Sequence, residues 1–359
     1  MNIEEQLIQH VKFVTIELSH LWISLNMAKI PVSENILQRI SQAVGASQIS
    51  HVELIQPLWG GYGQLFRAYV CGTSYPSVIV KYIRLPQPSS HPRGWNTPLS
   101  HQRKLQSYLV EVNWYQHYAN AHSQQPLSPL PQCLYVEQQT NETLLVLQDL
   151  HTIGFTRVNP HVTPTVVRAC LTWLGYFHAQ YMSATPNGLW PVGTYWHLDT
   201  RPDEYAALSD GPLKSAAVMI DRVLSQCPFQ TLLHGDAKLA NFCFSEDNRA
   251  AAVDFQYIGQ GCGMKDVIML LSSVLNYHEP ESMIDAYLEH YFSELTHGLR
   301  KFHPHINPQD VLHAWRPLYC VAWADFKRFV KGWSVEHVKI NAYTESLTAL
   351  AIKQLTTST

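Results

Sequence analysis

The sequence is poor in charged residues and has no long hydrophobic run, and both features exclude whole classes of protein. Only 15% of its 359 residues are charged, whereas about 25% is usual in globular proteins. A charge-rich disordered or coiled-coil chain is therefore excluded. The longest apolar run, residues 267–275, has nine residues and includes two serines. A membrane-spanning helix needs about 20 apolar residues, so we expect no membrane partner.

Paired cysteines and clustered histidines are also missing. The seven cysteines lie far apart and form no C-x-x-C pair, which is typical of reduced thiols in a reducing compartment. The nineteen histidines are scattered, and the closest two, His303 and His305, lie in a proline-flanked segment, so no zinc site is expected. The first five residues include two glutamates, where a signal peptide has basic residues. These features predict a cytoplasmic protein.

The chain has no strong net charge, but it has enough apolar residues for a full core. Its formal charge is −3 and 46% of its residues are hydrophobic, so no nucleic-acid partner is expected. Residues 1 to about 45 have helical periodicity, short strand-like runs follow them, and helical periodicity dominates again from about residue 165. A helix is predicted at 103–119, between strands at 54–58, 65–71, 77–83 and 143–148. The order predicts an α+β chain with a small strand-rich part, a larger helical part and a junction near residue 150.

One predicted hairpin brings an amide and a carboxylate together. Residues 241–244 and 250–255 have the pattern of two short strands, and the polar turn 246–249 joins them. If this turn is the centre of the hairpin, Asn241 lies opposite Asp254. Side chains directly opposite in an antiparallel pair are about 5 Å apart, so we expect these two at one end of the hairpin.

A second carboxylate is expected at the same end. Asp236 precedes Asn241 by five residues and lies on the loop that leads into the hairpin. Two carboxylates and an amide oxygen suit a hard cation such as Mg²⁺, which completes its shell with phosphates and water. The alternative, a polar turn beside an incidental aspartate and asparagine, stays open at this point.

An interval without acids indicates an ion pair elsewhere in the chain. Lys81 lies in the middle of a predicted strand, and the next acidic residue is Glu111, in the middle of the predicted helix. Phosphoryl transfer needs a cation for the α- and β-phosphates and a partner that holds the cation. A strand lysine followed by a helical glutamate suits that pair. A lysine at a sheet edge and a solvated glutamate are the alternative for either residue alone.

Three glycines separate the first two strands. Gly60, Gly61 and Gly63 precede Lys81, and glycines there let backbone N–H groups approach phosphates closely. A simple tight turn explains the same glycines. The P-loop pattern G-x-x-x-x-G-K-[ST] is absent from the sequence, which excludes that class of nucleotide site.

Together these residues resemble the protein-kinase-like fold, in particular its aminoglycoside phosphotransferase, choline kinase and ecdysteroid-kinase-like group. The resemblance rests on two motifs, His234-Gly235-Asp236 with Asn241, and Asp254-Phe255-Gln256. Protein kinases have an arginine after the histidine and a glycine after the phenylalanine. Gly235 therefore indicates the small-molecule branch, and Gln256 its ecdysteroid-kinase-like members. Residues 146–150 and 174–179 resemble the hinge and the helix before the catalytic loop of that group.

The resemblance implies a two-lobed α+β fold and a set of roles. Residues 1–149 would form an N-lobe with a helical extension, a small antiparallel nucleotide-binding sheet and the helix carrying Glu111. Residues 150–359 would form a larger, mostly helical C-lobe with the catalytic loop and the acceptor site. The implied cofactors are ATP and Mg²⁺. The implied roles are Asp236 as base, Lys238 at the γ-phosphate, Asn241 and Asp254 at Mg²⁺, Gly60, Gly61, Gly63, Lys81 and Glu111 at the phosphates, and the backbone at Gln148, Asp149 and Leu150 at adenine. Asp266 is expected to cap the next helix and brace the catalytic loop.

The implied partner is a small molecule with a hydroxyl group. Trp315, Tyr319 and Trp323 are spaced by four residues and form either an aromatic core stripe or a wall for the acceptor. Two other functions are open alternatives. One is an inactive nucleotide-binding scaffold, which the retained motif residues disfavour. The other is a protein kinase, which Gly235 and the absence of an Ala-Pro-Glu segment after Asp254 disfavour.

Overall fold

The first part of the chain is a five-stranded antiparallel sheet between two helices. The computed structural model describes residues 32–84, 98–119 and 127–357, and the predicted N-terminal helical extension lies outside them before residue 32. The strand order is β1-β2-β3-β5-β4. The elements of this part are α2 (Glu34–Val44), β1 (Gln48–Pro57), η1 (Trp59–Gly61), β2 (Gly63–Cys71), β3 (Ser77–Arg84), α3 (Pro98–His117), β4 (Cys133–Gln138) and β5 (Glu142–Gln148).

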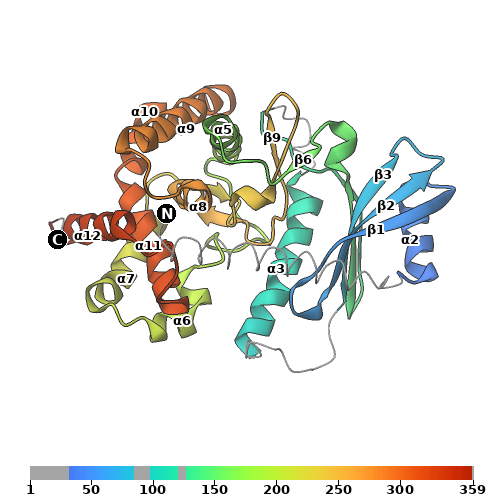
Figure 1. Ribbon diagram of the computed structural model, residues 1–359, viewed down its shortest axis with the longest axis horizontal. Coiled ribbons are helices and arrows are strands. Elements are labelled where there is room, and N and C mark those ends of the chain that lie inside the picture. The colour runs from blue at the N-terminus through green and yellow to red at the C-terminus, as the bar shows by residue number, and fades with distance from the viewer. Residues whose placement is uncertain (1–31, 85–97, 120–126, 358–359) are drawn as a thin grey trace, which may run out of the picture.

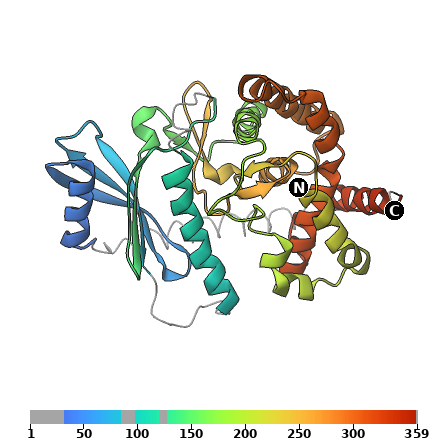
Figure 2. The ribbon, with the colours of Figure 1, turned by 180° about the vertical axis from the view of Figure 1, so that it is seen from behind.

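The two helices cover opposite faces of this sheet. Helix α2 starts at the N-cap Ser33, ends at Gly45 in the left-handed region, and buries Ile36 and Ile40 against the outer face. Helix α3 lies on the other face, between the sheet and the rest of the molecule (Figures 1 and 2). Central strand β3 is buried or half-buried along its length except at Arg84, and its lysine is one of the buried residues.

The second part of the chain is mostly helical and contains two small sheets. One sheet pairs β7 with β10, and the other has the order β6-β8-β9. The large apolar core lies between helices α5, α8, α9 and α11. The elements are η2 (Leu150–Ile153), β6 (Arg157–Val158), α5 (Pro164–Gln180), η3 (Leu198–Thr200), α6 (Pro202–Ala207), α7 (Gly211–Ser225), β7 (Thr231–Leu233), η4 (Leu239–Asn241), β8 (Phe242–Phe244), β9 (Ala250–Ala252), β10 (Gly259–Gly261), α8 (Met264–Val274), α9 (Glu281–Phe302), α10 (Pro308–Trp315), α11 (Leu318–Trp333) and α12 (Ala342–Thr357).

The predicted α+β class is confirmed, with differences in detail. Strand β4 was not predicted, because its six residues follow a proline-rich stretch and form an edge of the sheet. The helix predicted from residue 103 begins earlier, at Pro98, where a proline is tolerated in the first turn. The sheet ends at Gln148, and the proposed lobe boundary between residues 149 and 150 stays a prediction. Among the described residues no helix is both long and apolar enough to cross a bilayer.

Candidate active site

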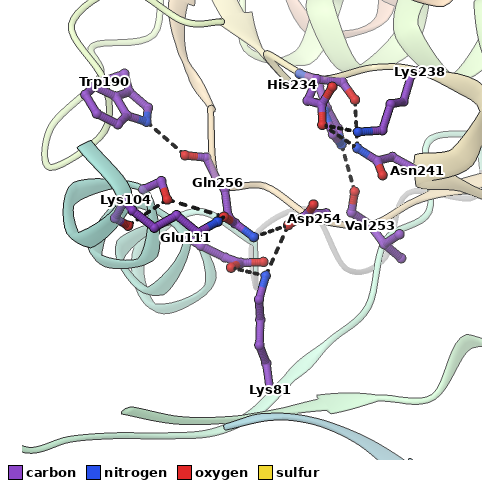
Figure 3. Close-up of polar contacts among 12 residues, drawn as sticks. Lys81, Lys104, Glu111, Trp190, His234, Lys238, Asn241, Val253, Asp254 and Gln256 are labelled. Carbon is purple, nitrogen blue, oxygen red and sulfur yellow. Dashed lines mark hydrogen bonds and ion pairs between the residues drawn. The ribbon is translucent and has the colours of Figure 1, made fainter. Parts of the chain in front are cut away.

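The strand lysine and the helical glutamate form the expected ion pair. Lys81 Nζ lies 2.6 Å from Glu111 Oε2 and 3.1 Å from Asp254 Oδ1, and Lys81 and Glu111 are only 5% and 2% exposed. Burial by itself would lower the pKa of Lys81, but the carboxylates of Asp254 and Glu111 raise it above its ordinary value. The lysine is therefore charged and joins β3, α3 and the segment after β9 (Figure 3).

Asp266 holds the loop that carries the His-Gly-Asp motif. Its carboxylate accepts the backbone N–H groups of His234 and Gly235, at 2.6 and 2.9 Å. The prediction that it braces the loop is confirmed, and the prediction that it caps helix α8 is wrong, because it lies inside the helix and Gly263 is the N-cap. These bonds satisfy two buried backbone N–H groups, which would otherwise lack a partner away from water.

Gly235 has a steric reason to be glycine. Its φ is 80°, and a Cβ at this position would lie 2.0 Å from the carbonyl oxygen of Tyr257. Neither the left-handed backbone nor this close approach suits a side chain. The arginine that protein kinases carry after the histidine therefore cannot fit here without moving the segment after Asp254.

Asp236 lies in the loop with one oxygen held and one free. Its Oδ2 accepts from Lys238 Nζ at 2.8 Å and from Asn241 Nδ2 at 3.1 Å. Its Oδ1 is buried and has no hydrogen-bond partner among the described residues. Burial raises the pKa of Asp236, although the Lys238 ammonium acts in the opposite direction. This carboxylate is held in place and can still accept a proton on Oδ1.

The predicted register of the hairpin is wrong by one residue. In the structure Phe242 pairs with Ala252 and Phe244 with Ala250, so Asn241 faces Val253 and bonds to its N–H through the backbone carbonyl, at 2.9 Å. The cause is the turn. It closes with three residues between Ser245 and Arg249, because Asn248 adopts a left-handed conformation with φ 61°, which asparagine tolerates.

Asp254 follows the hairpin, and its carboxylate contacts residues from both parts of the chain. Its backbone is left-handed, with φ 69°. Its Oδ1 accepts from Lys81 Nζ and, at 2.6 Å, from Gln256 Nε2. Burial would raise its pKa, but Lys81 and then Lys104 lower it well below the ordinary range. No described residue donates to Oδ2, and the side chain is 37% exposed, so this oxygen is available to a ligand.

The oxygens at this site fit a hard cation. Asn241 directs its Nδ2 at Asp236, which turns its Oδ1 away from that carboxylate, and Asp254 presents Oδ2. No group of three or more histidine, cysteine or acidic side chains suited to a metal occurs within the described part of the chain. An amide oxygen and a carboxylate oxygen are ligands of the kind that Mg²⁺ takes, and it keeps waters and substrate phosphates as its other ligands. The residues present therefore fit a nucleotide-bound Mg²⁺.

Comparison with known proteins identifies the family. Residues 57–304, more than half of the chain, match the sequence model of the phosphotransferase enzyme family APH. The chain belongs to this family. The resemblance stated from the motifs is thereby confirmed, and with it the kinase-like two-lobed fold. No curated protein sequence in the comparison matches the chain.

Solved structures of other phosphotransferases are similar to this one at low identity. The microcompartment-associated aminopropanol kinase is 15% identical over 89% of this chain and 98% of that one, with a TM-score of 0.46. The choline kinase of Streptococcus pneumoniae is 14% identical over 90% and 98%, with a TM-score of 0.42. The macrolide 2'-phosphotransferase of Brachybacterium faecium is 12% identical over 89% and 98%, with a TM-score of 0.46. The family assignment rests on the sequence match.

The glycines and the hinge of this phosphotransferase are placed as follows. Gly60 and Gly61 are left-handed residues of η1, and a Cβ on Gly61 would meet no atom within 4 Å. Gly63 begins β2, and a Cβ there would lie 2.0 Å from the Tyr82 carbonyl oxygen, so strand packing alone requires this glycine. The Asp149 side chain is occupied by the fold, because it accepts from Arg67, Ser77 and the His151 N–H group.

The aromatic stripe of the C-terminal part is core. Trp315 ends α10, whereas Tyr319 and Trp323 belong to α11, so the three do not share one helix. All three are buried, and the interpretation as an acceptor wall is wrong. Helix α11 is buried from Tyr319 through Val330, so the aromatic residues on it lie in the interior with the rest of the helix.

Sequence reasoning missed two tyrosines and a lysine near the catalytic loop. The rings of Tyr195 and Tyr257 meet edge to face at 5.7 Å, and Tyr195 N–H donates to the Gly235 carbonyl at 3.3 Å. Burial and then the Asp236 carboxylate raise the pKa of the Tyr195 hydroxyl. Lys104 on α3 donates to Gln256 Oε1 at 2.8 Å. The sequence signal was that Gln256 ends the Asp254-Phe255-Gln256 motif and that Tyr257 directly follows it.

Proposed function

We propose that the protein is an ATP-dependent kinase that transfers the γ-phosphate of ATP to a hydroxyl group of a small organic acceptor. One observation carries the proposal. Asp236 keeps a buried Oδ1 without a partner among the described residues while Lys238 and Asn241 fix its Oδ2. An unpaired buried oxygen is costly, and a substrate hydroxyl would satisfy it. The carboxylate is therefore arranged to receive a donor that the chain does not supply.

In the proposed reaction Asp236 orients the acceptor and takes its proton. The acceptor oxygen attacks the γ-phosphorus, the bond from that phosphorus to the oxygen bridging to the β-phosphate breaks, and the electron pair leaves with ADP. The hydroxyl proton passes to Asp236 Oδ1. Because burial raises the pKa of this carboxyl, it is a better proton acceptor than an exposed aspartate.

Residues of both lobes would hold the nucleotide. Lys81, kept charged and oriented by Glu111, would bind the α- and β-phosphates. Lys238 would use the N–H groups that it does not direct at Asp236 to hold the γ-phosphate. Asn241 Oδ1 and Asp254 Oδ2 would hold Mg²⁺. When bound, Mg²⁺ would neutralise charge on the β- and γ-phosphate oxygens.

The remaining proposed contacts are those of the glycine loop with the phosphates, of the hinge with adenine, and of two tyrosines with the acceptor. The backbone N–H group at Gly60 would face the phosphates, whereas the Gly61 N–H group donates to the Leu58 carbonyl oxygen at 3.3 Å and would have to leave that bond to join it. The backbone between Gln148 and Leu150 would bind adenine. The acceptor would lie against Tyr195 and Tyr257, whose pKa values are raised in part by the Asp236 carboxylate. Sequence and structure support no choice among choline, an aminoglycoside and a steroid alcohol.

The test is ATP turnover against a panel of alcohols, with Asp236→Asn as the matched variant. Wild type with Mg²⁺ is expected to release ADP in the presence of some acceptor. The variant keeps the shape and the bond to Asn241 but cannot take the proton, so we expect kcat to fall about 10²–10⁴-fold. Thermal melting with ATP should show the same stabilisation in both proteins, because bound ligand stabilises the folded state whatever the chemistry.

Two results would contradict the proposal. If wild type and Asp236→Asn were equally inactive on a broad panel while ATP still raised both melting temperatures, the protein would be a nucleotide-binding scaffold. If phosphate went to a protein serine in preference to every alcohol, it would be a protein kinase. Omission of Mg²⁺ from the active reaction should abolish turnover, and retained turnover without divalent cation would exclude the proposed metal role.

A further inference from the structure

Gln256 is a buried amide that connects the proposed metal ligand to helix α3. Its side chain donates from Nε2 to Asp254 Oδ1 at 2.6 Å and accepts at Oε1 from Lys104 Nζ at 2.8 Å. Ser107 Oγ lies 3.3 Å from the same Oε1. The residue is 6% exposed, and the close-up shows its amide between Lys104 on one side and Asp254 on the other (Figure 3).

The direction of this amide follows from chemistry. An ammonium group has only donors and a carboxylate has only acceptors. The oxygen of Gln256 must therefore face Lys104, and the NH₂ group must face Asp254. The reverse orientation would place an NH₂ group against an ammonium and an oxygen against a carboxylate, and it would lose both charge-assisted bonds. Lys104 thus determines which end of the amide Asp254 meets.

The backbone of Gln256 is fixed as well. Trp190 Nε1 donates to its carbonyl oxygen at 2.8 Å. Lys104 in turn lies 4.5 Å from the centre of the Tyr108 ring, and that ring is 6.0 Å from the ring of Tyr62 in the glycine loop. The side-chain amide therefore has little freedom to rotate. Its contacts connect α3 and the glycine loop with the segment after β9.

The consequence concerns the free oxygen of Asp254. Gln256 and Lys81 both donate to Oδ1, so this oxygen is satisfied and the carboxylate cannot turn without breaking two bonds. No described residue donates to Oδ2. A ligating carboxylate that is held by a hydrogen-bonding partner outside the metal shell binds metal more tightly, and loss of that partner lowers metal affinity about 10–100-fold.

We propose that Gln256 is a positioning residue that presents Asp254 Oδ2 to the metal, and that Lys104 sets the direction of its amide. The inference rests on the proposed role of Asp254 as a metal ligand. Helix α3 then reaches Asp254 by two routes, through Glu111 and Lys81 and, two turns earlier, through Lys104 and Gln256. Protein kinases have glycine at the position of Gln256. The second route therefore exists only because this chain has a glutamine there.

The experiment compares Gln256→Leu with Gln260→Leu. The control glutamine is half-buried and donates to a backbone carbonyl at 3.3 Å, but it has no bond to Asp254. Mn²⁺ binding in the presence of ADP is measured by electron paramagnetic resonance, and turnover is measured across Mg²⁺ concentrations. For Gln256→Leu we expect Mn²⁺ affinity to fall about 10–100-fold and half-maximal activity to need correspondingly more Mg²⁺. Gln260→Leu should match wild type in both readouts.

A second pair of variants tests the link to Lys104. Lys104→Met leaves the amide in place but free to rotate, so we expect a smaller loss of Mn²⁺ affinity than in Gln256→Leu. Because both residues act through one contact, the double variant should bind Mn²⁺ no more weakly than Gln256→Leu alone. An additive loss would show that Lys104 acts on the ligand by itself and would overturn its assigned role. Gln256→Glu gives an independent check, since it keeps an acceptor for Lys104 but sets a carboxylate against Asp254 and should also weaken Mn²⁺ binding.

The outcomes separate this inference from the proposed function. If wild type transfers phosphate but Gln256→Leu and Gln256→Glu keep wild-type Mn²⁺ affinity, the inference is wrong and the function stands. If wild type transfers no phosphate to any acceptor, yet Mn²⁺–ADP binding falls in the Gln256 variants and not in Gln260→Leu, the function is wrong and the positioning role stands. A purely structural role would lower the melting temperature and leave the Mn²⁺ affinity of the folded fraction unchanged.

Discussion

Two ionic clusters in this molecule are alike in composition but differ in whether both oxygens of their central carboxylate have hydrogen-bond donors. The site cluster consists of Lys81, Glu111 and Asp254, with nitrogen–oxygen distances of 2.6 and 3.1 Å. It joins the sheet, helix α3 and the segment after β9. Its third member is 37% exposed and keeps Oδ2 free of donors from the described residues. A cluster that holds a carboxylate in place without satisfying it is arranged for a ligand.

The second cluster is closed. The helical cluster consists of Lys265, Asp325 and Arg328, with side chains at most 2% exposed. Asp325 Oδ1 accepts from Arg328 at 2.9 Å, and its Oδ2 accepts from Trp196 Nε1 at 3.0 Å and lies 3.3 Å from Lys265 Nζ. Both carboxylate oxygens are used, so the cluster fixes α11 against α8, and the atom it leaves without a partner among the described residues is a donor, Arg328 Nη1. The comparison teaches that buried charge alone does not mark a site, and that the two clusters differ in whether a carboxylate oxygen stays free of donors.

The comparison predicts a large loss of stability for a substitution in the helical cluster and a small change for the same substitution in the site cluster. Asp325→Asn leaves two buried cations without a carboxylate, and we expect the free energy of unfolding to fall by about 3–5 kcal/mol. Asp254→Asn leaves Lys81 still paired with Glu111 and removes a partly exposed charge, so we expect a change below about 1 kcal/mol. Urea unfolding of both variants measures the difference. Equal destabilisation would show that the site cluster also holds the fold together.

Acid should act on the helical cluster in a defined direction. Burial would raise the pKa of Asp325, but Lys265 and then Arg328 lower it to about 2, below the value near 4 of an unfolded aspartate. A carboxyl with a lowered folded-state pKa stabilises fully above its unfolded pKa and loses that contribution as pH falls through the folded pKa.

The stability gap between wild type and Asp325→Asn should therefore narrow between pH 4 and pH 2. The part of the gap that depends on ionisation amounts to about 2 kcal/mol. Urea unfolding at pH 5, 3.5 and 2.5 follows it, with Asp254→Asn as the comparison at each pH. A gap that stayed constant over this range would mean that Asp325 does not change its protonation there, and its assignment as the charged centre of the helical cluster would fail.

The sequence was sufficient to predict contacts that follow from the order of residue types along the chain. It was insufficient to predict contacts that depend on how distant segments pack. The pair of Lys81 and Glu111 was predictable because no other acid occurs between residues 82 and 110. The contact of Lys104 with Gln256 spans 152 residues, and its formation depends on how α3 packs against the helical part. No local pattern encodes that packing.

The wrong hairpin register and the ambiguity of the aromatic stripe both have physical causes. The hairpin register was missed because the left-handed Asn248 shortens the turn by one residue, and asparagine tolerates that conformation without requiring it. The aromatic stripe was ambiguous because spacing by four residues fits a core face and a ligand wall equally. Only the burial of Trp315, Tyr319 and Trp323 decides between them, and burial on every side of α11 depends on the packing of α7, α8 and α12 around it.

The smallest predicted effect belongs to an ion pair outside both clusters. Arg316 and Glu289 form a pair on the surface, with Nη2 and Oε2 3.2 Å apart and side chains 44% and 64% exposed. Water and salt screen such a pair, so Glu289→Gln should lower the free energy of unfolding by less than about 1 kcal/mol, and 1 M NaCl should erase the difference. Urea unfolding at low and high salt checks this. A loss comparable to that of Asp325→Asn would mean that geometry outweighs burial, and the contrast between open and closed clusters would no longer explain where charge stabilises this protein.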